Sequence, residues 1–132
     1  MPGFLRKKEF EKVVRALWDK VKEKFVEDVA FDDELLLLTK ARNSDNIYLE
    51  RYKDYNKGQS GWYIGAINMT EDMPKPEKGD IEHIAVCDIL KLRPDLLKLL
   101  SLPKGYIITI LHNEIVEIMD GDSKIVYKKL EN

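Results

Sequence analysis

Hydrophobic positions along the chain first follow a helical spacing and then change to a strand spacing. Between about Lys7 and Asp28, apolar residues recur every three or four positions with charged residues between them, which predicts an amphipathic helix. Its apolar positions are Phe10, Val13, Val14, Leu17, Trp18, Val21 and Phe25. We expect this stripe to cover one face of a sheet. The alternative is a basic amphipathic helix that binds a membrane or a partner groove.

Most later apolar segments have the length and alternation of β-strands. Leu35–Leu38 is a short apolar run, and Asn46–Tyr52 alternates, which puts Tyr48, Glu50 and Tyr52 on one predicted face. Further strands are predicted at Gly61–Ala66, Ile81–Val86, Tyr106–Leu111, Glu114–Met119 and Lys124–Tyr127. Gly65, inside a strand, indicates a bulge or a close approach of another group to the backbone.

The stretch Ile81–Ile110 contains the highest density of apolar residues of the kind usually buried, so we expect the rest of the chain to pack against it. Asp88 is a predicted N-cap for a helical segment at Ile89–Arg93. Pro94 suits the first turn of a second segment, Asp95–Leu100.

Two turn signals follow this stretch, His112-Asn113 and Asp120-Gly121, and the second is a strong hairpin signal. Residues 106–127 therefore form a predicted antiparallel meander. The predicted fold is α+β: a mostly antiparallel sheet of about six strands, covered by the N-terminal helix within residues 1–28 and by the 88–100 helices. At 132 residues the chain, 1–132, is predicted to be a single domain.

Composition points to the cytoplasm. The single Cys87 cannot form an internal disulfide and is expected to be buried in its apolar run. No window reaches the eighteen or so apolar residues of a membrane span, and the N-terminal sequence lacks the apolar core of a signal peptide. We therefore predict a cytoplasmic protein that does not bind membranes.

Charge is unevenly distributed along the chain. The formal net charge is −2, but residues 1–26 carry eight Lys or Arg and four Asp or Glu, which leaves −6 for the remainder. One acidic cluster comprises Glu27, Asp28, Asp32, Asp33 and Glu34, and a second comprises Glu71, Asp72, Glu77, Asp80 and Glu82. Acidic surface disfavours nucleic acid and favours a basic partner. The simpler interpretation is solvated loops that maintain solubility.

No metal, cofactor or catalytic site is predicted. His83 and Cys87 would lie roughly 13 Å apart on one strand, too far to share a zinc ion, and His112 lies in a hairpin turn. His83, Cys87 and Asp88 have the chemistry of a nucleophilic site, but no oxyanion turn accompanies them. The glycines match no phosphate-binding motif.

Aromatic residues form a candidate interaction surface. Trp62, Tyr63, Tyr48, Tyr52 and Tyr55 could form a patch with Arg51 and Lys53, and such residues anchor interfaces or stack on bases. For Trp62 and one tyrosine, the favoured place is the sheet core. The aromatic patch and the acidic loop together supply six candidate partner-binding residues: Tyr52, Tyr55, Glu71, Asp72, Glu77 and Asp80.

Three segments together carry a family resemblance: Ser60-Gly61-Trp62-Tyr63-Ile64-Gly65, the run from Ala85 to Leu97, and Leu102-Pro103-Lys104-Gly105-Tyr106. This combination resembles a bacterial family of domains of unknown function whose members are described as immunity proteins of polymorphic toxin systems. The resemblance covers roughly residues 60–119.

The resemblance implies a cytoplasmic, non-enzymatic binding protein that neutralises a cognate toxin by occluding its active site or a required surface. A basic toxin domain would suit the acidic loop, because carboxylates can imitate phosphate and speed the encounter. Two alternatives stay open. One is a structural or adaptor protein of phage or secretion origin that works through homo-oligomers, and the other is a small hydrolase using His83, Asp88 or Cys87.

Overall fold

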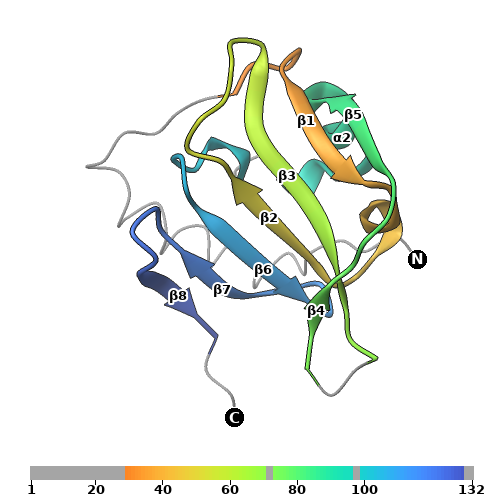
Figure 1. Cartoon of the computed structure of the whole chain (residues 1–132), viewed down its shortest axis with the longest axis vertical. Coiled ribbons are helices and arrows are strands. Elements are labelled where there is room, and N and C mark those ends of the chain that lie inside the picture. The colour runs from red at the N-terminus through yellow and green to blue at the C-terminus, as the bar shows by residue number, and fades with distance from the viewer. Residues whose placement is uncertain (1–28, 71–72, 97–98, 130–132) are drawn as a thin grey trace.

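The computed structural model describes residues 29–70, 73–96 and 99–129, which form an α+β fold built on one sheet (Figure 1). The predicted N-terminal helix, Glu71 and Asp72 lie outside these residues. The described strands are β1 (Glu34–Leu38), β2 (Ile47–Arg51), β3 (Gln59–Asn68), β4 (Lys75–Pro76), β5 (Ile81–Ala85), β6 (Ile107–Leu111), β7 (Glu114–Met119) and β8 (Ile125–Lys128). The described helices are η1 (Thr39–Asn43), α2 (Val86–Leu92), η2 (Pro94–Leu96) and η3 (Leu99–Ser101), where η denotes 3-10 geometry.

The sheet order is β5-β1-β3-β2-β6-β7-β8, with β4 paired to the end of β3. Only β1 and β3 run parallel among the described strand pairs, so the predicted mostly antiparallel sheet is confirmed. The described residues form eight strands, more than the predicted sheet of about six, and seven of them lie at the strand segments predicted from the sequence. One strand that was not predicted is β4, in a segment expected to be a loop, where the Glu77 amide donates to the Ala66 carbonyl.

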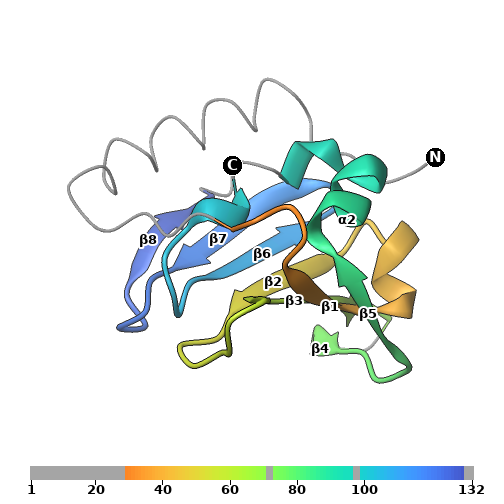
Figure 2. The same cartoon turned by 90° about the horizontal axis from the view of Figure 1, so that it is seen from above.

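The two faces of the sheet differ. Alternate strand residues on one face are buried and form the core, among them Leu35, Leu37, Ile47, Leu49, Ile64 and Ile108. Complete burial of one such side chain contributes roughly 1.5–3 kcal/mol. Figure 2 shows α2 and the 3-10 turns after it on this side of the sheet. No described helix covers the other side, which we call the open face.

Helix α2 begins earlier than predicted, and Asp88 is not its N-cap. Strand β5 continues directly into the helix, whose N-cap is Ala85 and makes no side-chain cap bond. The amides of Val86 and Cys87 instead donate to the carbonyls of Asp33 and Phe31. These distant carbonyls accept the hydrogen bonds that the first amides of a helix usually donate to a capping side chain. Asp88 lies within the first turn of the helix instead of before it.

Both predicted hairpin turns are present, and the 106–127 meander is confirmed. His112 and Asn113 both have positive φ, at 52° and 63°, as a two-residue hairpin with the strand twist requires. In the second turn, the Asp120 carboxylate accepts hydrogen bonds from the amides of Asp122 and Lys124 at 2.9 and 3.0 Å.

Candidate functional site

Two motif segments of the sequence converge on one buried side chain, Arg51. Its Nε donates to the Ser60 carbonyl at 3.0 Å, and a terminal nitrogen donates to the Leu102 carbonyl at 2.7 Å. The guanidinium also lies over the Trp62 ring, 5.7 Å from its centroid. Arg51 is only 2% exposed, so its predicted place in an exposed aromatic patch is wrong. It joins the Ser60-Gly61-Trp62 strand to the Leu102–Gly105 turn.

The Leu102–Gly105 turn (Leu-Pro-x-Gly in sequence) is also bound to the backbone of β2. The Gly105 amide donates to the Arg51 carbonyl at 2.7 Å, and the Arg51 amide donates to the Tyr106 carbonyl at 2.9 Å. The Trp62 indole donates to the Leu100 carbonyl at 2.7 Å. These bonds fix the segment before β6 against the end of β2. They therefore also fix the position of the strand ends at this edge of the open face.

Tyr55, a predicted partner-binding residue, is half-buried and packs onto this end of the sheet. Its ring lies directly over Gly61, where an added Cβ would be 2.4 Å from a ring carbon. The Arg51 guanidinium and the Lys104 ammonium lie 5.5 and 5.2 Å from the ring centroid. Tyr55 therefore has an internal packing role, and its contact with a partner stays a prediction.

The structure does not bring the aromatic and acidic candidates together. Tyr52 lies beside the start of β3, where its amide donates to the Gly61 carbonyl, whereas Glu77 is bonded to Ala66 near the other end. The strand between these points spans roughly 16 Å. Asp80 lies at the acidic end, where its carbonyl accepts from the Thr39 amide. The predicted single surface is therefore two separate regions, and a partner role for either stays a prediction.

The open face carries a different set of residues at its centre. As predicted from the alternation of β2, Tyr48, Glu50 and Tyr52 lie on the face opposite the core. Tyr63 on β3 is the register partner of Glu50, and its ring meets the Tyr48 ring edge to face, with centroids 5.8 Å apart. Tyr52 is 44% exposed. We call Glu50 and these three tyrosines the tyrosine cluster.

Gly65 makes room for the cluster. It is the register partner of Tyr48, and an added Cβ would lie 2.6 Å from two atoms of the Tyr48 ring. The close approach that was predicted at this glycine is therefore confirmed.

Replacing Gly65 with alanine is expected to displace the Tyr48 ring from Tyr63 and to lower the free energy of unfolding by about 1 kcal/mol. In a Tyr48→Ala background the same change should be neutral or stabilising, because the clash is gone and alanine restricts the unfolded chain. A double-mutant cycle by denaturant unfolding measures this coupling. Additive effects of the two substitutions would show that the ring does not depend on Gly65.

Burial raises the pKa of Tyr48 from 10.0 to about 12, and nearby Tyr63, Glu50 and Tyr52 add to the shift. Burial, followed by the charge of Glu50, also raises the pKa of Tyr52. Tyr48 and Tyr52 therefore keep their phenol protons to higher pH than an unburied tyrosine does.

This shift predicts a pH dependence of stability. Between pH 10 and 12 the unfolded chain loses the Tyr48 proton first, so the free energy of unfolding should fall as pH rises through this window. Tyr48→Phe should make that fall shallower, as measured by denaturant unfolding at several pH values between about 9 and 12. Parallel curves for the two proteins would contradict the assigned shift.

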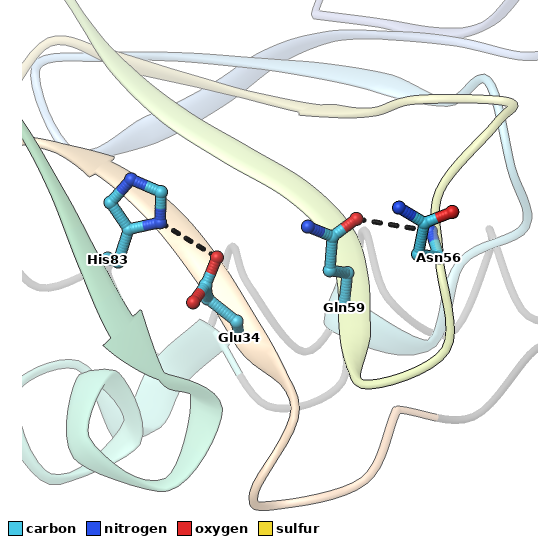
Figure 3. Close-up of polar contacts among 4 residues, drawn as sticks. All are labelled: Glu34, Asn56, Gln59 and His83. Atoms are coloured by element: carbon cyan, nitrogen blue, oxygen red, sulfur yellow. Dashed lines mark hydrogen bonds and ion pairs between the residues drawn. The ribbon is translucent and has the colours of Figure 1, made fainter.

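A polar row lies beside the cluster, at the β5 side of the open face. Figure 3 shows the His83 ring directed at Glu34 of β1, with Nδ1 2.8 Å from Oε1, and Gln59 of β3 directed at Asn56. Both His83 and Glu34 are substantially exposed. Their pairing joins β5 to β1.

No described contact joins His83 to Cys87 or Asp88, the other two residues of the hydrolase hypothesis. His83 is engaged with Glu34, whereas the Cys87 sulfur lies 4.0 Å from Asp88 in α2. Cys87 is only partly buried, contrary to the prediction, because Val86 and Ile89 take the core-facing positions of this short helix. Within the described residues, no group of three or more His, Cys, Asp or Glu could hold a metal ion, and no helix is long and apolar enough to cross a membrane.

The comparisons with known proteins decide the family. The model of the Imm33-like domain matches residues 14–121. This chain belongs to the Imm33-like family. Searches of curated proteins and of solved structures gave no match.

The sequence resemblance to immunity proteins covered roughly residues 60–119. The family match of this Imm33-like protein is longer and includes β1 and β2. Arg51 and most of the tyrosine cluster lie on β2 or just after it. The family domain therefore contains both the residues that hold the end of the sheet and the residues on its open face.

Glu50 was not among the candidate site residues predicted from the sequence, and Tyr48 and Tyr63 were named only in the wider aromatic patch, not among the six partner-binding residues. A signal for Glu50 was present, because the alternation of β2 puts it between two tyrosines on one face. Tyr63 joins them only through the pairing register of β2 with β3, which the sequence pattern does not determine.

Proposed function

We propose that this Imm33-like protein is an immunity protein that binds one cognate toxin and neutralises it by covering the toxin's active site or a required surface. Catalysis has no part in this function, and the protein acts in the cytoplasm as a soluble partner of the toxin. The observation that supports the proposal most is family membership combined with a sheet face that no described helix covers and that presents three tyrosines around a carboxylate.

Tyrosines are suited to this role. Their rings supply a large rigid contact area at a small cost in side-chain entropy, and they are enriched among the residues that dominate binding energy. Tyr48 packs over Gly65, and the rings of Tyr48 and Tyr63 pack against each other, so little of their freedom is lost on binding. Tyr52 adds an exposed edge of the same surface.

The charge of the surface favours a basic toxin domain. Glu50 lies within the cluster, while Glu77 and Asp80 lie at the far end of β3. Acidic groups around an apolar contact raise the rate of encounter with a cationic surface and exclude anionic ones.

The test is co-expression with the toxin domain encoded next to the gene. The wild-type chain should form a complex and restore growth, and Tyr48→Ala/Tyr63→Ala should lose both. Asp122→Lys, an exposed change in the β7–β8 turn, is the matched control and should protect fully. Glu77→Lys/Asp80→Lys tests the acidic end separately. No complex and no protection by the wild-type chain would overturn the proposal.

A further inference from the structure

Glu50 differs from the other carboxylates of the described strands in having no cationic partner among the residues that the structure describes. Glu34 pairs with His83, Glu82 with Arg42 and Glu114 with Lys129. Glu117 lies opposite Lys128 across the β7–β8 pair. Within the described part of the chain, the register partners of Glu50 are Tyr63 and Ile107, which carry no charge.

The surroundings of Glu50 suit a planar cation. Tyr48 and Tyr52 precede and follow it by two residues on the same face of β2, and Tyr63 lies directly across on β3. Aromatic faces attract cations, and the raised pKa values of Tyr48 and Tyr52 keep their hydroxyl groups neutral. Glu50 is half-buried, so a cation bound to its carboxylate is partly shielded from water and is attracted more strongly than at a fully exposed acid.

We propose that the tyrosine cluster is a receptor for one arginine side chain of a protein partner, with the Glu50 carboxylate accepting from the guanidinium while the tyrosine rings flank its plane. Arginine fits better than lysine because its flat fork bonds a carboxylate at two points and stacks on aromatic rings. This inference rests on the proposed function, since it assigns the contact through which the toxin would be bound.

The first arm of the test needs no toxin. The ¹⁵N-labelled full chain is titrated with N-acetyl-L-argininamide, and separately with the citrulline and lysine analogues, while backbone amide signals are followed. Saturable shifts centred on residues 48–52, 63 and 107 are expected with the arginine compound. They should be absent with the uncharged citrulline analogue and lost in Glu50→Gln. Equal shifts in Glu50→Gln, no shifts, or tighter binding of the lysine analogue would overturn the inference.

The second arm uses the neighbouring toxin domain. Glu50→Gln keeps the shape of the side chain, so its Kd for the toxin should rise by about thirtyfold, while Asp122→Asn, at an exposed acid in the β7–β8 turn, should change it less than about threefold. If Glu50→Gln binds the toxin with wild-type affinity, this inference is overturned and the proposed function still stands.

If the wild-type chain does not bind the toxin, the proposed function is overturned, even if argininamide binds. A concentration-dependent dimer that Glu50→Gln abolishes would identify a second copy as the occupant and overturn the assignment.

Discussion

Replacing Arg51 with methionine is expected to lower the free energy of unfolding by about 3 kcal/mol or more. Arg51 donates charge-assisted hydrogen bonds to the carbonyls of Ser60 and Leu102, and each such bond contributes roughly 1.5–3 kcal/mol. Methionine keeps the apolar stem but leaves both buried carbonyls without this donor. The rings of Trp62 and Tyr55 also lose the cation that lies against them.

Denaturant unfolding with matched thermal melts measures this effect. Lys57→Met also replaces a cationic side chain with methionine, at an exposed loop position, and should stay within about 0.5 kcal/mol of the wild type. Arg51→Lys should be nearly as damaging as Arg51→Met, because one ammonium cannot reproduce the geometry of the guanidinium fork. Equal stability of Arg51→Met and Lys57→Met would show that Arg51 does not hold the motif segments together.

Gly105→Ala is expected to cost about 3 kcal/mol through two independent causes. Gly105 has φ of +85°, a conformation that L-residues adopt at a cost. An added Cβ would also lie 2.7 Å from the Cα of Gly121, and backbone cannot move aside as a flexible side chain can. The turn that receives Arg51 would therefore have to shift away from the β7–β8 turn.

Gly58→Ala separates the two causes. Gly58 has a similar φ of +89°, but an added Cβ would meet no atom within 4 Å. This variant should lose only the conformational part, about 1 kcal/mol. Equal losses at the two glycines in denaturant unfolding would mean that the contact between Gly105 and Gly121 is unimportant.

Local patterns predicted those parts of the fold that depend on alternation and turn chemistry. The period of two in β2 correctly placed Tyr48, Glu50 and Tyr52 on one face, and the Asp120-Gly121 signal correctly located a hairpin. The same period also puts Arg51 on the face of Ile47 and Leu49, which was a signal of its burial. The interpretation that put Arg51 in an aromatic patch did not use this parity.

Features that depend on distant partners could not be predicted. The start of α2 is determined by carbonyls of Phe31 and Asp33, which lie far earlier in the chain. The insertion of β3 between β1 and β2 brings Tyr63 beside Glu50, and neither periodicity nor turn signals determine strand order. The candidate site was therefore only partly predictable, through the residues that share β2.

The positions of His83, Cys87 and Asp88 bear on the two alternative functions, a small hydrolase and an adaptor protein. His83 is engaged by Glu34 on the open face, and the Cys87 thiol lies beside Asp88 on α2. No described contact therefore brings the His83 imidazole to the Cys87 thiol, as a Cys–His form of the small-hydrolase alternative would require. The adaptor alternative requires self-association. The comparison of the wild-type chain with Glu50→Gln would detect it as a concentration-dependent dimer.

If this protein acts by occupying a surface and makes or breaks no bond, its effect on the toxin must be stoichiometric and reversible. The most direct test adds increasing amounts of the wild-type chain to a fixed amount of the neighbouring toxin domain and measures the remaining toxin activity. We expect a linear fall to zero at about one equivalent, independent of incubation time, with full activity recovered when the complex is dissociated. Time-dependent inactivation by far less than one equivalent, with a change in the mass of the toxin, would contradict this mode of action.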